Sequence, residues 1–150
     1  MKARGFTLIE LVIAVAIVAV LAAAALPLNE LVVQRAKEQD LRRALRDIRV
    51  AIDAYKQASD EGRIVRRVGE SGYPRRLEEL VQGVEDQKSP KRERIYFLRR
   101  LPPDPLVADG KWGLRSYASG PEDPREGEDV FDVYTLAPGN GINGRPYRDW

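Results

Sequence analysis

Two residue types are missing from this chain, and each absence removes a class of chemistry. Cysteine does not occur among the 150 residues, which excludes disulfides and thiolate metal sites. Histidine does not occur either, so the commonest general base and the commonest transition-metal ligand are gone. Asp, Glu, Lys and Ser remain, yet this composition argues against an enzyme.

A large charge of one sign is also lacking. The chain has 25 Lys and Arg against 23 Asp and Glu, a net charge of +2. Overall charge therefore gives no case for nucleic-acid binding. With a membrane segment set aside, roughly 120 residues remain, enough for one domain with a modest core.

What the chain does have is a long apolar run close to its start. Residues 11–28 hold eighteen positions without a charge, which as a helix of ~1.5 Å per residue span ~27 Å, close to a bilayer core. Lys2 and Arg4 precede the run, and no basic residue follows it until Arg35. The positive-inside rule then predicts a single-pass helix with a cytoplasmic N-terminus.

The same segment has a second interpretation, as an ordinary secretory signal peptide with a cleavage site in "LAAAALP". Glu10 argues against it, because a carboxylate inside an apolar stretch is costly. Locally, "TLIE" from Thr7 to Glu10 fits a capping box at the start of a helix. The positive end of the helix dipole favours an acid there too.

The string "RGFTLIE" followed by the apolar run resembles the class III signal of type IV pilins and type II secretion pseudopilins. The resemblance implies that a membrane peptidase removes the leader 1–5 by cutting after Gly5, and that the new N-terminal Phe6 is N-methylated. Glu10 matches the glutamate that such proteins carry five residues into the mature chain. Pro27 matches their proline. Residues 6–28 would then form the transmembrane and filament-core helix.

The resemblance gives Glu10 a role in assembly. Its carboxylate would form a salt bridge with the amine of Phe6 from an adjacent subunit, because an unpaired buried charge costs several kcal/mol. Pro27 removes one helix hydrogen bond and clashes with the preceding turn, which predicts a kink or local melting at residues 23–27.

Beyond the apolar run, the pattern predicts an amphipathic helix that continues to about residue 60. Leu41, Leu45, Ile48, Ile52 and Tyr55 recur at spacings of 4, 3, 4 and 3, which places them on one face. Gly62 is the expected stop. Glu38 lies four residues before Arg42, the spacing of a supporting surface pair. A free coiled coil is the alternative for this helix.

The remaining sequence predicts a small antiparallel β domain, and hence an α+β fold. We expect a short helix at 74–82, strands at about 111–118 and 129–137, and a C-terminal loop that ends on the aromatic Trp150. The polar segment between 84 and 94 predicts a connector. Basic residues near Tyr96 and Phe97 would suit single-stranded nucleic acid, but a solvated face or a protein contact is the more common use of such a run.

The order of "LPPDP", a strand begun by tryptophan, "DVFDVYTL" and a glycine-rich tail is similar to the major, G-type pseudopilin of type II secretion. That resemblance implies a pilin-like fold with a periplasmic domain at 29–150, anchored in the bacterial inner membrane. The implied function is a filament subunit that drives protein secretion. Implied partners are the peptidase and methylase, sister pseudopilins, an assembly platform and an ATPase. The alternatives are a type IV pilus subunit, or a soluble domain released by ordinary signal cleavage.

G-type pseudopilins typically bind calcium in the loop after the last strands, and here the correspondence is imperfect. The matching stretch "APGNGING" has Asn140 and Asn143, whereas calcium usually takes carboxylates among six to eight oxygens. Asp129, Asp132 and Asp149 are the weak candidates. We favour a tail held without a metal, by burial of Tyr147 and Trp150, and expect no other cofactor.

Overall fold

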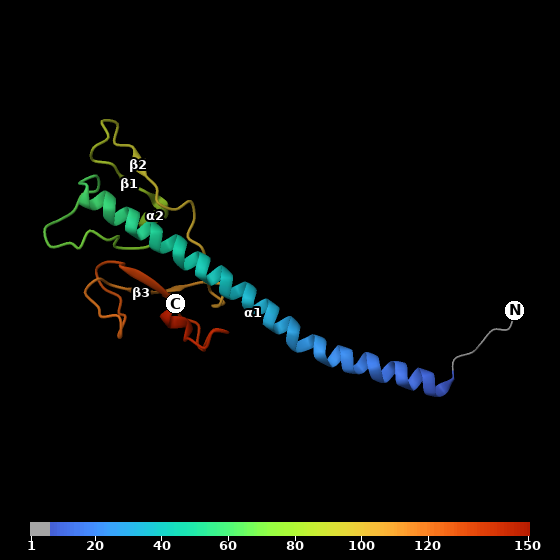
Figure 1. The fold of residues 1–150 in the computed structure, drawn as a ribbon. Coiled ribbons are helices and arrows are strands. Elements are labelled where there is room, and N and C mark those ends of the chain that lie inside the picture. The colour runs from blue at the N-terminus through green and yellow to red at the C-terminus, as the bar shows by residue number, and fades with distance from the viewer. Residues whose placement is uncertain (1–6) are drawn as a thin grey trace. The chain divides into compact units, whose positions relative to one another are not determined.

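The computed structural model describes residues 7–150, apart from the side chains of residues 24–28. The chain divides into two compact units, residues 1–36 and residues 37–150. Helix α1, Leu8–Asp60, has residues in both units (Figure 1). The boundary at 28/29 between a membrane segment and a periplasmic domain stays a prediction. Among the described side chains of α1, Glu38 is the first that is buried.

Within the unit 37–150, one face of α1 forms half of the core. Leu41, Leu45, Ile48, Ile52 and Tyr55 are all buried, which confirms the face predicted from their spacing. Its other buried apolar members are the alanines Ala44, Ala51 and Ala58. This face packs on the chain's own domain, which leaves no need for the coiled-coil alternative.

Gly62 ends helix α1, as its position predicts. Its φ is +72°, a conformation that glycine adopts at little cost. The Gly62 amide donates to the Ser59 carbonyl at 3.0 Å, and the Arg63 amide donates to the Ala58 carbonyl at 2.9 Å. These two bonds satisfy carbonyls that the last turn leaves free and form a Schellman cap.

The middle of the chain holds a short helix and a small hairpin. Helix α2 covers Glu78–Gln82, shorter than the predicted 74–82, because the Pro74 carbonyl accepts the Val130 amide at 2.7 Å instead of a helical donor. Strands β1 (Val84–Glu85) and β2 (Arg94–Ile95) pair antiparallel. The polar connector prediction is therefore wrong for these positions.

The second sheet consists of β3, Trp112–Arg115, and β4, Asp132–Thr135, which also pair antiparallel. Both are shorter than the predicted 111–118 and 129–137. After β3 the chain turns, because the Tyr117 amide donates to the Asp129 carboxylate at 2.8 Å rather than to a neighbouring strand. In the tail predicted as loop, Tyr147–Asp149 form a 3₁₀ helix, η1.

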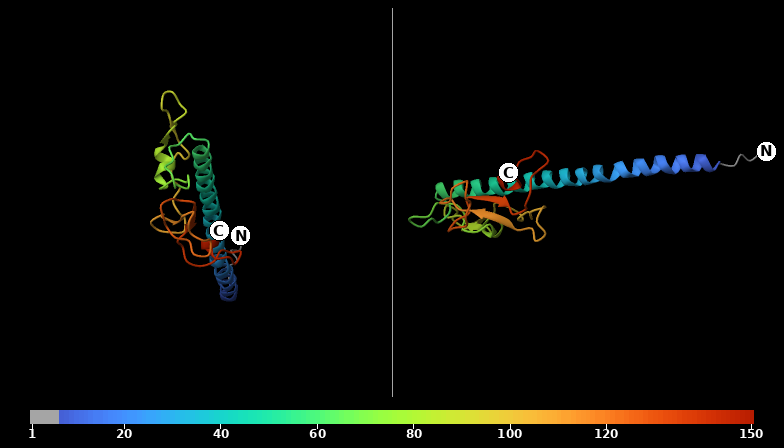
Figure 2. Two further views of the ribbon diagram at one scale, coloured as in Figure 1. Left: turned by 90° about the vertical axis from the view of Figure 1, so that its left-hand side faces the viewer. Right: turned by 90° about the horizontal axis from the view of Figure 1, so that it is seen from below.

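The core lies between the second half of α1 and these elements. Leu80 of α2, Val133 of β4 and Val130 just before it are almost fully buried. Trp112 begins β3 with its indole in the core, and its Nε1 donates to the Pro102 carbonyl at 2.8 Å. Figure 2 shows this sheet lying along the second half of α1. The architecture confirms the α+β fold, a long N-terminal helix with small antiparallel sheets.

Candidate functional site

The first described turn of α1 is closed by a capping box. The Glu10 amide donates to the Thr7 hydroxyl at 3.3 Å, and Glu10 Oε2 accepts from the Thr7 amide at 3.2 Å. The two side chains also contact each other at 3.2 Å. The "TLIE" string thus acts as the local pattern predicts. Glu10 is exposed, so its carboxylate remains accessible to a further cationic partner.

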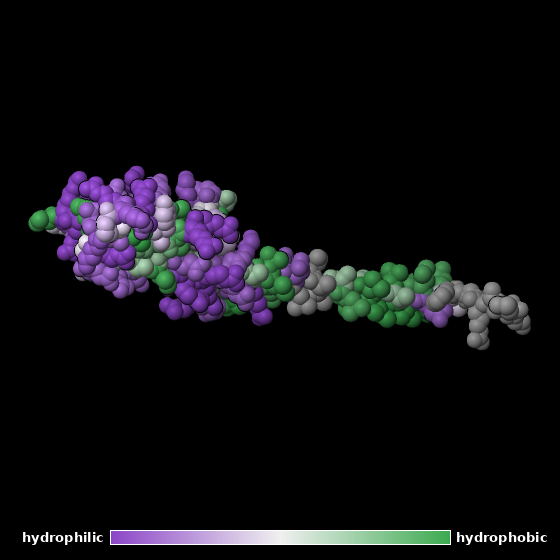
Figure 3. Space-filling model, turned by 90° about the horizontal axis from the view of Figure 1, so that it is seen from above, coloured by the Kyte–Doolittle hydropathy of each residue, from purple (hydrophilic) through white to green (hydrophobic). Residues whose placement is uncertain are grey.

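The helix that follows presents apolar side chains on every side. All residues from 8 to 23 are exposed; Leu8 keeps 82% and Ile13 53% of its surface. Figure 3 shows this stretch as almost continuous hydrophobic surface. A helix that is apolar all round is stable only when it is surrounded by lipid or by other protein segments. Nothing in the described part of this chain covers it.

No helix among the described residues is long and apolar enough to cross a membrane. Two further sequence predictions lie outside what is described. Gly5 and Phe6 precede the first described residue, and the side chain of Pro27 lies in the segment 24–28. The cleavage site and the kink therefore stay predictions, as does the pairing of Glu10 with Phe6.

Of the three calcium candidates, Asp129 is surrounded by donors. Its Oδ1 accepts from the Ser116 hydroxyl and the Tyr117 amide, both at 2.8 Å. Its Oδ2 accepts from the Ser71 hydroxyl. These bonds join three separate loops, so the carboxylate already has a structural role.

The other two candidates lie elsewhere and pair with arginines. Asp132 Oδ1 accepts from Arg49 Nε at 2.7 Å, and Asp149 lies 3.6 Å from Arg148 Nε. Among the described residues, no three acidic side chains gather into a group that could hold a metal ion. The structure brings the three candidates to different places.

The tail is held to α1 by Glu38, which its spacing from Arg42 had placed on the surface. Glu38 is only 5% exposed, not on the surface. Its Oε1 accepts from the Ile142 amide at 2.8 Å and from the Tyr147 hydroxyl at 3.0 Å. The sequence does indicate this burial, because Glu38 lies three residues before Leu41 and continues the spacing of the buried face.

Further contacts complete this tail clamp, which we define as Glu38, Arg42, Arg49, Tyr147 and Trp150. Arg49 Nη2 donates to the Trp150 carbonyl at 2.8 Å. The Arg42 guanidinium lies over the Trp150 ring at 4.3 Å, a cation–π geometry. Tyr147 is buried as predicted, whereas Trp150 is only partly buried.

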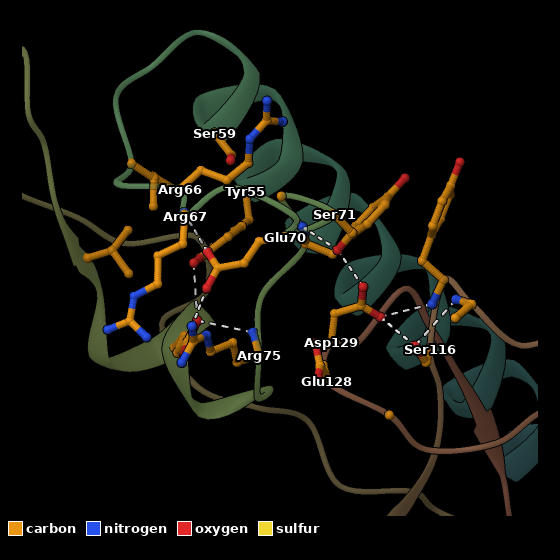
Figure 4. Close-up of a pocket in the computed structure, with 18 of the residues that line it drawn as sticks. Tyr55, Ser59, Arg66, Arg67, Glu70, Ser71, Arg75, Ser116, Glu128 and Asp129 are labelled. Carbon is orange, nitrogen blue, oxygen red and sulfur yellow. Dashed lines mark hydrogen bonds and ion pairs between the residues drawn. The ribbon is translucent and has the colours of Figure 1, made fainter.

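A wide hollow of the unit 37–150 opens beside the end of α1 (Figure 4), with a volume of about 1490 Å³. Small-molecule pockets are commonly ~300–1,000 Å³ and more enclosed. Burial, followed by the nearby Glu79, raises the pKa of Tyr55 above its usual range. Hydrogen bonds from the Arg67 amide and from Arg75 lower the pKa of Glu70. The Tyr55 hydroxyl donates to Glu79, and Glu70 pairs with Arg75, so these groups are engaged with one another.

Residues 1–26 match the family described as Prokaryotic N-terminal methylation motif. The match includes Gly5, Phe6 and Glu10. Comparison with the curated proteins gave no match, and comparison with the solved structures gave none.

The motif indicates a type IV pilin-like subunit. It implies processing by a prepilin peptidase and assembly into a pilus-like oligomer. It also favours a structural subunit over an enzyme. Subunits of pili and of type II secretion pseudopili are not distinguished by it.

Proposed function

We propose that this protein is a structural subunit of a periplasmic pseudopilus that drives type II secretion. The observation that carries the proposal is the methylation motif at residues 1–26, joined to a helix whose apolar side chains from Leu8 to Leu21 have no partner in the described chain. A filament core made of packed helices would cover that surface. The folded unit 37–150 would then decorate the filament.

Before assembly the subunit is anchored in the bacterial inner membrane by residues 6–28, with its N-terminus cytoplasmic and residues 29–150 periplasmic. A peptidase cuts after Gly5 and a methylase modifies Phe6. The mature subunit then joins sister pseudopilins on an assembly platform served by a cytoplasmic ATPase. The order of motifs from "LPPDP" to the tail favours the secretion filament over a type IV pilus subunit.

In the assembled filament, Glu10 pairs with the amine of Phe6 from a neighbouring subunit. The capping box explains how Glu10 is tolerated before assembly, because Thr7 supplies hydrogen bonds to its carboxylate. Packing the helices removes water from this carboxylate. A second positive partner is then needed, since an uncompensated buried charge costs several kcal/mol.

Two substitutions separate capping from charge. Glu10→Gln keeps an oxygen that can accept from Thr7 and loses only the negative charge, whereas Glu10→Ala loses both. We expect both variants to enter the membrane and both to fail in filament assembly, measured by cross-linking in cells. If Glu10→Gln assembles normally and only Glu10→Ala fails, capping is the function of Glu10 and the pairing proposal is wrong.

The two alternatives predict different cellular outcomes. A deletion strain that loses motility or surface filaments while it still secretes proteins would favour a type IV pilus subunit. The mass of the mature protein tests the soluble alternative, because ordinary signal cleavage would start the chain near Leu26, whereas our proposal starts it at a methylated Phe6.

A further inference from the structure

Two short segments of the unit 37–150 carry opposite charge. Residues 88–100 contain six basic side chains against the single acid Glu93. The six are Lys88, Lys91, Arg92, Arg94, Arg99 and Arg100, which we call the basic hairpin. Residues 122–129 contain five acids against the single base Arg125. The five are Glu122, Asp123, Glu126, Glu128 and Asp129, which we call the acidic loop. The first segment therefore has a net charge of +5 and the second of −4, whereas the whole chain has +2.

The basic hairpin is exposed, and its cations form no ion pair with the described acidic side chains. All six of its cations are exposed. Ten ion pairs join described residues across the chain, and none of them involves these six. By contrast, Arg63 beside the same hairpin pairs with Asp86 at 2.6 Å. The fold therefore pairs charges nearby and leaves these cations to solvent.

Most acids of the acidic loop are likewise exposed and form no ion pair. Glu122, Glu126 and Glu128 are exposed, and the ion pairs of the described residues include none of the three. Asp123 pairs with Arg125 of the same loop, and Asp129 accepts hydrogen bonds from Ser71, Ser116 and Tyr117. No ion pair joins the basic hairpin to the acidic loop within one copy. Arg94 lines the same hollow as Glu126 and Glu128, but the tip of the β1–β2 hairpin is directed away from the orange loop in Figure 1.

We propose that the basic hairpin of one copy binds the acidic loop of the next copy. This inference rests on the proposed filament function and names a contact within it. Two different patches on one subunit make a heterologous contact, and such contacts form open helical filaments when the rotation does not close. Complementary charge also fixes register and raises the rate of encounter. Neither effect requires a strong single pair, and an exposed ion pair is individually weak.

Nucleic acid is the other partner that a basic hairpin with the exposed Tyr96 would suit. Nucleic-acid binding would explain the basic hairpin but not the acidic loop, because acids on the same unit would repel phosphates. A second copy of the chain accounts for both segments at once. The charge pattern therefore favours self-association.

The absence of cysteine makes the contact directly testable in the full chain. A chain with Lys91→Cys is produced together with a chain with Glu126→Cys in the native cell, and filaments are oxidised and extracted. We expect mixed disulfide dimers in excess of those from Lys91→Cys with Ala108→Cys, a control position that is also exposed. A chain with both Lys91→Cys and Glu126→Cys should give a ladder of oligomers. Closure of that chain into monomers alone would overturn the proposal, because it would place both segments together in one copy.

Charge reversal tests the physical cause. Lys88→Glu with Lys91→Glu should lower the filament yield about tenfold, since attraction becomes repulsion at several sites. Glu126→Lys with Glu128→Lys should do the same. The chain with all four changes restores opposite charges at every contact and should recover most of the yield. Failure to recover, with binding of a single-stranded oligonucleotide lost in the Lys88→Glu and Lys91→Glu chain, would assign the hairpin to nucleic acid instead.

The outcomes separate this inference from the filament function itself. Normal filaments in electron micrographs without the mixed disulfide would overturn the hairpin–loop contact and leave the proposed function intact. A cell in which the unaltered chain forms no filament would overturn both.

Discussion

Replacing Glu38 by alanine should remove much of the stability of the domain. The carboxylate is 5% exposed and accepts from the Ile142 amide at 2.8 Å and the Tyr147 hydroxyl at 3.0 Å. Truncation leaves both donors without this acceptor, at ~1–3 kcal/mol for each buried group. Ile142 itself keeps 42% of its surface, so water relieves part of its loss. We therefore expect Glu38→Ala to lower the free energy of unfolding by ~2–4 kcal/mol.

The assay is urea unfolding of a fragment that begins near residue 30, followed by the fluorescence of Trp112 and Trp150. Glu38→Gln is the matched control, because its amide oxygen still accepts a hydrogen bond. Tyr147→Phe removes one donor and keeps the ring. In the Glu38→Ala background, Tyr147→Phe should cost at least about 1 kcal/mol less than it does alone. A Glu38→Ala fragment within about 0.5 kcal/mol of the unaltered one, the range of ordinary surface changes, would refute the clamp.

Three further outcomes are expected. Gly5→Leu should block removal of the leader, because a leucine side chain crowds a peptidase site fitted to glycine; intact mass checks this, and a fully processed variant would show that the glycine is dispensable. Trp150→Ala should lower the free energy of unfolding by ~2 kcal/mol, less than for a fully buried aromatic ring, because the ring is only partly buried between Arg42 and Tyr147. Because the clamp holds the tail by protein contacts, the melting curves of the fragment in calcium and in chelator should coincide; a rise of several degrees with calcium, lost in chelator, would instead show that a cation binds the native state.

The sequence alone predicted the structure correctly where one pattern repeats over many residues. The spacing from Leu41 to Tyr55 predicted both helix α1 and the face that is buried, because a helical face is a local property. The composition around Trp112 and Val133 predicted two strands that do pair. The start of α1 followed from the chemistry of Thr7 and Glu10 alone.

The elements and contacts that the sequence did not predict depend on residues far apart in the chain. Strands β1 and β2 were missed because each has only two residues, too few to show an alternating pattern. Their position is set instead by the Phe97 and Leu98 amides, which donate to the Leu80 carbonyl at 3.0 and 2.9 Å. In the same way, nothing near Asp129 in the sequence reveals its bond to Ser71, 58 positions earlier.

The tail clamp also sets an order of events in folding. Ile142 and Tyr147 reach Glu38 across 104 and 109 positions, separations that make loop closure slow compared with the formation of a helix. Helix α1 can therefore form early while Glu38 is still hydrated. Glu38 becomes buried only when the tail packs against α1, so the clamp closes late. Unfolding follows the opposite order of events. The tail is released first, and water reaches Glu38 before the apolar face from Leu41 to Tyr55 is exposed.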